Sequence, residues 1–149
     1  QEGESTSNAR MQGYEEGLAE YGITPIAEQS GNNVSDTAKA AMEDLLTRFN
    51  NEIDAVLCHN DDTAIGALSA CQDAGVADDI TIIGFDGNQS AVELVNSGDL
   101  AATIAQQPEE MGYTAVMNAY KAINGEEVEE SIPIETVFIT QENAAEYLK

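Results

Sequence analysis

Basic residues are scarce in this sequence of 149 residues, which has 5 lysines and arginines against 28 aspartates and glutamates. The formal net charge at pH 7 is therefore −23. A charge of this size and sign repels the phosphate backbone of nucleic acids and anionic membrane surfaces. We therefore expect no nucleic-acid partner, and the charge fits a protein that stays soluble in a salty or extracellular setting.

Long apolar runs are also missing, since none approaches the roughly 18 residues that a membrane-spanning helix needs. No signal peptide is visible, and the sequence opens with Gln1-Glu2-Gly3 instead of a methionine, so we expect a chain processed or cut from a longer one. There are 2 cysteines, Cys58 and Cys71, and they form no Cys-x-x-Cys pair. Buried free thiols are the expectation for them.

Motifs of enzyme chemistry are absent as well. The sequence contains no Gly-x-Ser-x-Gly elbow and no phosphate-binding loop with its lysine. Its one histidine, His59, stands near Asp61 and Asp62, but one histidine with two acids at this spacing is a weak metal signal, and Asp61 lies where a helix cap belongs. We therefore expect a protein that is not an enzyme and has no metal or other cofactor, with His59 as a hydrogen-bonded residue.

What the sequence does contain is an alternation of helical and strand patterns separated by glycines. Helices are expected at 8–21, 35–49, 61–74, 89–97 and 108–124, with a last helical turn at 143–148. Strands are expected at 24–28, 55–58, 81–85, 102–105 and 135–139. This alternation predicts an α/β fold with a parallel, doubly wound sheet.

The segment from Thr81 to Gly87 reads Thr-Ile-Ile-Gly-Phe-Asp-Gly and organises the rest of the chain. It predicts a buried strand that ends at Asp86. In open α/β sheets ligands bind beyond the carboxyl ends of the strands, so Asp86 is placed to meet a small polar ligand. The alternative, that Asp86 only caps the helix that follows, stays open at this point.

Polar residues follow four of the predicted strands, and a parallel sheet would bring them to one edge. These residues are 29–32, 59–62, 86–88, and Gln106 with Gln107. Amides both donate and accept hydrogen bonds, carboxylates accept from neighbouring hydroxyls, and Arg10 on the first helix can add a rigid donor fork. This set suits a polyhydroxyl ligand such as a sugar.

Several segments carry a resemblance to a known family. They are residues 9–14 (Ala-Arg-Met-Gln-Gly-Tyr), 53–56 (Ile-Asp-Ala-Val), 60–67 (Asn-Asp-Asp-Thr-Ala-Ile-Gly-Ala), 83–87 (Ile-Gly-Phe-Asp-Gly) and 98–108, which includes Ala-Thr-Ile-Ala-Gln. In order and spacing the chain resembles the ribose-binding type of periplasmic sugar-binding proteins, the solute receptors of ABC importers. The resemblance implies a flavodoxin-like lobe of a type I periplasmic binding protein, with two lobes that clamp one sugar. By motif position it implies sugar contacts from Arg10, Asn60, Asp86 and Gln106, with Phe85 adjacent.

The sequence departs from the family pattern in two ways. Asn33 stands where the family often has an aromatic ring that stacks on the sugar. The match also covers only the later half of such a receptor, without the first lobe and the strand expected before Gly3. The resemblance thus implies that residues 1–106 form the C-terminal sugar-binding lobe. It further implies that 107–134 are a hinge crossover and helix of the missing N-terminal lobe, and that 135–149 are a return strand and tail.

The resemblance also implies partners and a location: a sugar, the membrane permease of an ABC importer and the missing lobe, in the periplasm or anchored at the cell surface. Two alternatives remain. The first is the effector domain of a LacI-type repressor, which shares the fold, although no basic DNA-binding head is visible and Ala-Ala-Thr-Ile-Ala-Gln replaces the usual Pro-Pro-Leu-Thr-Thr-like segment. The second is a free-standing flavodoxin-like enzyme or regulator.

Overall fold

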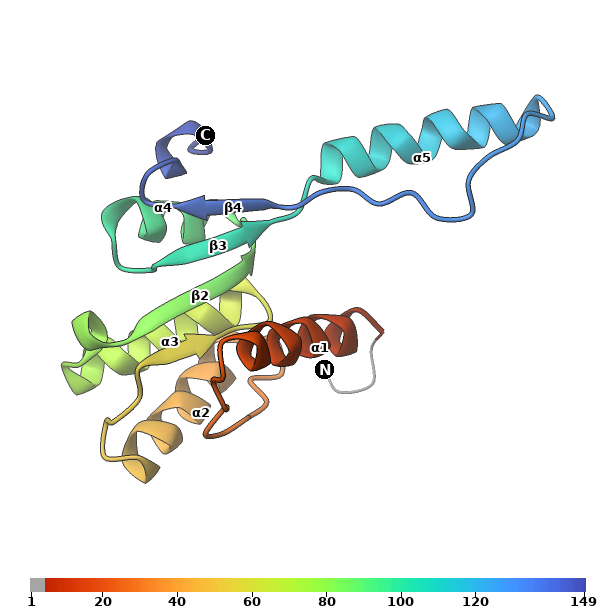
Figure 1. Cartoon of the computed structure of the whole chain (residues 1–149). Coiled ribbons are helices and arrows are strands. Elements are labelled where there is room, and N and C mark those ends of the chain that lie inside the picture. Colours follow the sequence, from red (N-terminus) through yellow and green to blue (C-terminus); the bar gives the residue numbers. More distant parts are fainter. Residues whose placement is uncertain (1–4) are drawn as a thin grey trace.

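The computed structural model describes residues 5–149 and is built around a four-stranded sheet with the order β1-β2-β3-β4 (Figure 1). The strands are β1 (Ala55–Leu57), β2 (Thr81–Asp86), β3 (Ala102–Ala105) and β4 (Val137–Thr140). The first three run parallel, and β4 runs antiparallel to β3. The α/β class is as predicted, but the expectation of an entirely parallel sheet is wrong for its last strand.

The reversal of β4 follows from the path of the chain between β3 and β4. The side-chain amide of Gln107 donates a hydrogen bond to the carbonyl of Glu135 at 2.8 Å, so the chain leaves and re-enters the sheet at the same end. A parallel neighbour requires a crossover that carries the chain back to the opposite end. The long excursion between Gln107 and Glu135 does not cross the sheet, and the returning strand must therefore run the other way.

The described residues form five α-helices, two before β1 and one after each of β1, β2 and β3. They are α1 (Ser5–Glu20), α2 (Ser35–Arg48), α3 (Asp61–Ala74), α4 (Gln89–Ser97) and α5 (Pro108–Ile123), followed by a short 3₁₀ turn at Ala144–Glu146. The description of α1 starts at Ser5, three residues before the predicted start of this helix. Within the described part of the chain, no helix is long and apolar enough to cross a membrane.

Helices cover the sheet on both faces. α3 and α4 lie on the face that carries Ile82, Gly84, Thr103 and Ile139, all of them buried. α1 lies on the opposite face beside β1, where Arg10 stacks on Phe85 (Figure 1). This second face is less well covered, since Phe138 in β4 remains 54% exposed.

The apolar core lies between the sheet, α3 and α4, with α2 packed against α3. Met42 and Leu46 of α2 are buried there, as the predicted helical period requires. Cys58 and Cys71 are buried free thiols, as expected. Burial raises the pKa of Cys58 to about 12 and also raises the pKa of Cys71. Both thiols therefore remain protonated at neutral pH.

The strand predicted at residues 24–28 does not form, and this segment is irregular and largely exposed. Among residues 5–149, β1 is the edge strand of the sheet, and the segment does not pair with the free edge of β1. Pro25 also lacks the N–H that a sheet ladder needs. A local strand pattern without a pairing partner cannot satisfy its backbone groups, and this explains the wrong prediction.

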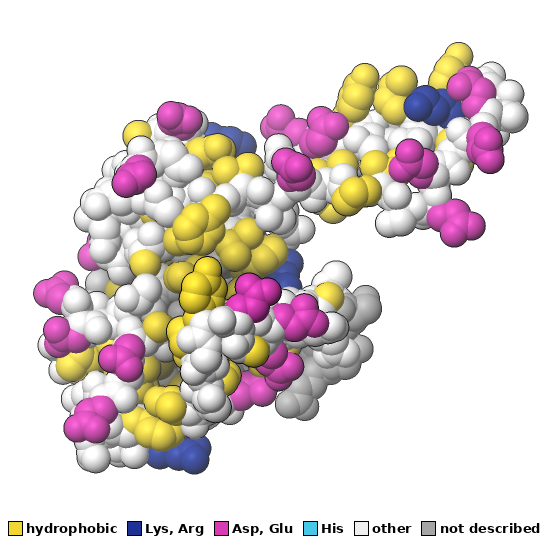
Figure 2. All heavy atoms as spheres, viewed as in Figure 1, with side chains coloured by type: hydrophobic (Ala, Val, Ile, Leu, Met, Phe, Trp, Pro, Cys, Tyr) yellow, Lys and Arg dark blue, Asp and Glu magenta, His cyan; other side chains and the backbone are white. Residues whose placement is uncertain are grey.

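α5 projects away from the sheet, and none of its residues is buried (Figure 1). Its apolar side chains are exposed along the helix, as Figure 2 shows, with Val116 at 68% and Ile123 at 85%. The predicted helix therefore forms but does not pack on the sheet.

Candidate functional site

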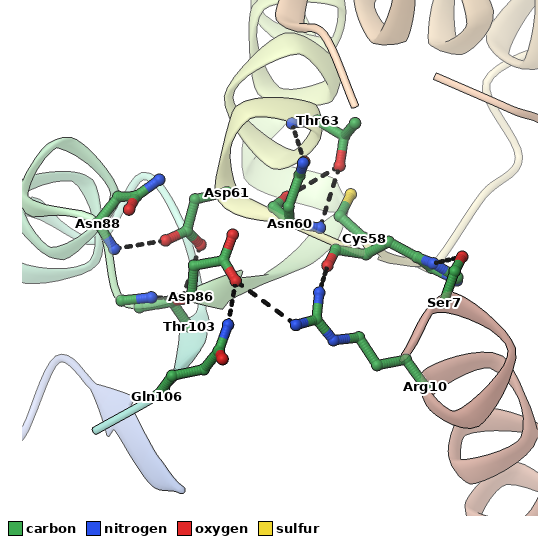
Figure 3. Close-up of polar contacts among 12 residues, drawn as sticks. Ser7, Arg10, Cys58, Asn60, Asp61, Thr63, Asp86, Asn88, Thr103 and Gln106 are labelled. Atoms are coloured by element: carbon green, nitrogen blue, oxygen red, sulfur yellow. Dashed lines mark hydrogen bonds and ion pairs between the residues drawn. The ribbon is translucent and has the colours of Figure 1, made fainter. Parts of the chain in front are cut away.

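A polar cluster gathers beyond the carboxyl ends of β2 and β3, where four of the five residues singled out in the sequence lie together (Figure 3). Asp86 ends β2, and Gln106 comes directly after β3. The two strands are parallel neighbours, and Asp86 is in register with Ala105. Arg10 reaches the same place from α1, so Asp86, Gln106 and Arg10 meet at the carboxyl edge of the sheet.

Asp86 is the centre of this cluster. Its Oδ1 accepts a hydrogen bond from the side-chain amide of Gln106 at 2.7 Å and lies 3.6 Å from Nη2 of Arg10. Among residues 5–149 its second oxygen, Oδ2, has no hydrogen-bond partner. A carboxylate with one oxygen fixed and the other free can accept a hydroxyl proton from a ligand.

Arg10 is held on three sides. Its Nη1 donates to the backbone carbonyl of His59 at 2.6 Å, its Nη2 faces Asp86, and its guanidinium carbon lies 3.7 Å from the ring centre of Phe85. A guanidinium over an aromatic face is favourable, and a planar fork fixed in this way is pre-organised for further hydrogen bonds. Phe85 therefore supports Arg10 with one face of its ring.

Asn60 lies at the edge of the cluster and begins α3. Its side-chain oxygen accepts from the backbone N–H of Thr63 at 2.9 Å, which makes Asn60 the helix cap. His59, the residue before Asn60, accepts the hydrogen bond from Arg10 through its backbone carbonyl. The start of α3 therefore helps to hold Arg10 in the cluster. In the loop of residues 29–32, Gly31 packs against the first turn of α3, since a Cβ there would lie 3.1 Å from a methyl group of Thr63.

His59 is a hydrogen-bonded residue, as expected, with its Nδ1 3.1 Å from the hydroxyl of Ser7. Partial burial lowers its pKa, and the positive charge of Arg10 acts in the same direction. The imidazole is therefore neutral at pH 7. Within residues 5–149 no three histidine, cysteine or acidic side chains come close enough to hold a metal ion.

Asp86 does not cap the following helix, which was the open alternative. The cap position of α4 belongs to Asn88, whose side chain makes no capping bond. Asp86 instead has a backbone φ of 121°, a conformation that costs energy for any residue other than glycine. Strained backbone of this kind is common at ligand sites, and it persists only where the surrounding structure holds it in place.

The sequence did not reveal the role of Asp61. It was expected at a cap, but its carboxylate is fully buried and accepts hydrogen bonds from the hydroxyl of Thr103 and the backbone N–H of Asn88, both at 2.7 Å. Burial raises its pKa, and these two hydrogen bonds act in the opposite direction. One signal was available: Gly84 in the middle of an apolar strand indicates a close approach by another group.

Asn33, which stands where the family often has an aromatic ring, is exposed and has a φ of 57°. Asn32 before it has a φ of 50°. Asparagine tolerates this left-handed conformation better than bulky residues do, so Asn33 suits its local backbone.

Residues 1–127 match the family model of the periplasmic binding protein domain. The ribose import binding protein of Escherichia coli (strain K12) is 34% identical over 140 residues, which are 94% of this chain and 47% of that protein. The chain thus spans about half the length of the curated relatives that it matches.

Two solved structures are similar in fold. An ABC transporter periplasmic solute binding protein from Actinobacillus succinogenes 130z, with bound D-allose, has a TM-score of 0.87 and 32% identity, over 93% of this chain and 49% of that one. The Caulobacter myo-inositol binding protein, bound to myo-inositol, has a TM-score of 0.83 and 33% identity, over 92% and 48%. Because the family model matches most of the length of this chain, the chain belongs to the periplasmic binding protein domain family.

Proposed function

We propose that this chain is the sugar-binding lobe of an extracytoplasmic solute receptor that delivers its ligand to an ABC importer. The observation that carries the proposal is the cluster of Arg10, Asp86 and Gln106 at the carboxyl edge of the sheet. Its support is twofold: the cluster has the donors and acceptors that a polyol needs, and the relatives named above bind ribose, D-allose or myo-inositol.

In this proposal each residue of the site has a distinct task. Asp86 accepts protons from the hydroxyls of the sugar, and Arg10 donates to their oxygens. The amides of Gln106 and Asn60 can do both, which suits a hydroxyl that donates and accepts. Phe85 holds the guanidinium of Arg10 in place, because the guanidinium lies against its ring.

We also propose that residues 1–106 and 135–149 form this lobe, while the crossover at 107–134 carries α5 to a second lobe. The support is that no residue of α5 is buried and that Tyr113, Val116 and Tyr120 are each more than half exposed. Covering such side chains contributes roughly 25 cal/mol per Å² of apolar area. A second lobe that packs on α5 would also fit the longer relatives.

The receptor in this proposal is not catalytic and releases its sugar unchanged. It acts outside the cytoplasm, in the periplasm or anchored at the cell surface, and its protein partner is the membrane permease of the importer. The relatives that support this are receptors of importers, so they do not favour the repressor alternative. The net charge of −23 also argues against a nucleic-acid partner.

The test is isothermal titration calorimetry on the complete receptor, with this chain as one of its lobes. The ligands are D-ribose, D-allose, myo-inositol and a panel of other pentoses and hexoses. We expect one of them to bind, and Asp86→Ala to weaken binding by at least about 2–4 kcal/mol, because buried hydroxyl donors lose their acceptor. Asp54→Ala is the control, since Asp54 is exposed at the opposite end of the sheet.

Two results would count against the proposal. If no sugar binds the unmodified receptor, the receptor function is wrong, and an unchanged affinity in Asp86→Ala would remove Asp86 from the site. Turnover of a bound sugar, followed by NMR over hours, would favour an enzyme instead.

A further inference from the structure

Asp61 is the buried acid of the site, and its neighbour Asp62 is exposed although both belong to the first turn of α3. The side chain of Asp61 has no accessible surface. Aspartate is almost never fully buried unless its charge is compensated. What compensates it here is a set of hydrogen bonds to two other parts of the site.

Those hydrogen bonds join three elements that are far apart in the sequence (Figure 3). Oδ1 of Asp61 accepts from the hydroxyl of Thr103 in β3, and Oδ2 accepts from the backbone N–H of Asn88. The hydroxyl oxygen of Thr103 in turn accepts from the backbone N–H of Gly87 at 3.2 Å. The two backbone N–H groups that follow Asp86 are thus both tied to the Asp61–Thr103 pair.

The segment held in this way contains the strained residue. Asp86 has a φ of 121°, and a backbone of this kind persists only where neighbouring contacts determine it. β2 leaves room for the holding group, since a Cβ on Gly84 would lie 2.3 Å from Oδ1 of Asp61. The carboxylate of Asp61 therefore fills the space beside β2 that a side chain at position 84 would occupy.

We propose that Asp61 is a positioning residue of the sugar site, which holds Gly87 and Asn88 directly or through Thr103 and thereby fixes the backbone that aims Asp86 at the ligand. Asp61 does not touch the ligand itself. The part that concerns the ligand rests on the proposed sugar-binding function, whereas the part that concerns the backbone does not. The competing explanation is that Asp61 only contributes to general stability.

The first experiment needs no sugar and uses NMR on the isotopically labelled chain. The three-bond HN–Hα coupling of Asp86 reports its φ, and hydrogen exchange of the Gly87 and Asn88 amides reports their hydrogen bonds. In Asp61→Ala we expect the coupling to change and the Asn88 amide to exchange roughly tenfold faster or more. Asp62→Ala, which removes the same charge from the same helical turn, should change neither.

Two further variants keep the test decisive if Asp61→Ala does not fold. Thr103→Val removes the hydroxyl from a fully buried side chain of similar shape and should free the Gly87 amide, while Thr103→Ser should restore its protection. Leu46→Val, a change in the buried core of α2, is the control for general destabilisation and should leave the reporters unchanged. Unchanged reporters in both Asp61→Ala and Thr103→Val would overturn the positioning role.

The second experiment measures sugar affinity by calorimetry in the receptor that carries this chain, with the sugar found to bind the unmodified protein. We expect Asp61→Ala to weaken binding by roughly tenfold or more and Asp62→Ala by less than about twofold. A loosened loop with unchanged affinity would overturn the link from Asp61 to the ligand. An unmodified receptor that binds no sugar would instead refute the proposed function, and the NMR result would still decide the role of Asp61 in the backbone.

Discussion

A single methyl group added at Gly66 tests how closely α2 and α3 must approach. A Cβ there would lie 2.2 Å from the carbonyl oxygen of Ser35, 3.0 Å from the Cβ of Ala38 and 3.0 Å from the backbone nitrogen of Lys39. Two of these atoms belong to the backbone of α2 and cannot rotate away. Gly66→Ala can therefore be accommodated only if α2 moves away from α3, which carries Asn60 and Asp61 at its start.

Two opposing effects set the size of the change. Alanine is favoured over glycine inside a helix by about 1 kcal/mol, which would stabilise the variant. Overpacking a close contact costs about 1–3 kcal/mol, and a contact of 2.2 Å with a backbone oxygen belongs at the upper end. Moving α2 also loosens Met42 and Leu46, which are 2% and 3% exposed. We expect the free energy of unfolding to fall by about 1–2 kcal/mol net.

The assay is urea unfolding of the 149-residue chain, followed by far-ultraviolet circular dichroism. Gly17→Ala in α1 is the matched control, because nothing lies within 4 Å of the position of its Cβ. That variant should equal or exceed the unmodified chain, by up to about 1 kcal/mol. If Gly66→Ala proved as stable as Gly17→Ala, the close packing of α2 on α3 would be refuted.

Three further predictions use the same chain. Burial raises the pKa of Asp61, so the contribution of Asp61 to stability is complete below its unfolded pKa of about 3.9 and is lost as the pH rises through its folded pKa. The unmodified chain should therefore lose stability relative to Asp61→Asn from pH 4 upward in urea titrations, and the opposite slope would contradict this. The net charge of −23 should make added potassium chloride raise the melting temperature, by screening repulsion between acids, and a constant or falling melting temperature would argue against it. Without a second lobe the isolated chain should bind sugar poorly, and a monomer by light scattering that binds at micromolar affinity would overturn the half-receptor hypothesis.

The helices that the sequence located best are those that end at a glycine. α3 (Asp61–Ala74) and α4 (Gln89–Ser97) have the predicted bounds, and the glycines after them, Gly75 and Gly98, have φ values of 71° and 92°. A helix stop of this kind depends on one residue and its neighbours, so it can be read from a short window. Strands depend on partners elsewhere, and the failed strand at 24–28 and the reversed β4 show that limit.

The site was predictable where strand order alone brings residues together. Asp86 and Gln106 follow neighbouring parallel strands, so their meeting needs only the rule that parallel strands share a carboxyl edge. The role of Asp61 was not predictable in this way, because Asn60 and Asp61 are both good caps and the pattern does not say which one caps α3. Only the packing decides, since the carboxylate of Asp61 turns inward to Thr103.

The two glycines that flank Phe85 and Asp86 show how one short segment serves two requirements. Gly84 is needed for space, because the carboxylate of Asp61 occupies the position that a side chain there would take. Gly87 is needed for conformation and contact, since its φ is 74° and a Cβ would lie 2.4 Å from that of Ala105. With both glycines in place, Asp61 can hold the backbone from inside while Asp86 keeps one oxygen free at the edge. One acid thus supports the loop, and the other is left available to a ligand.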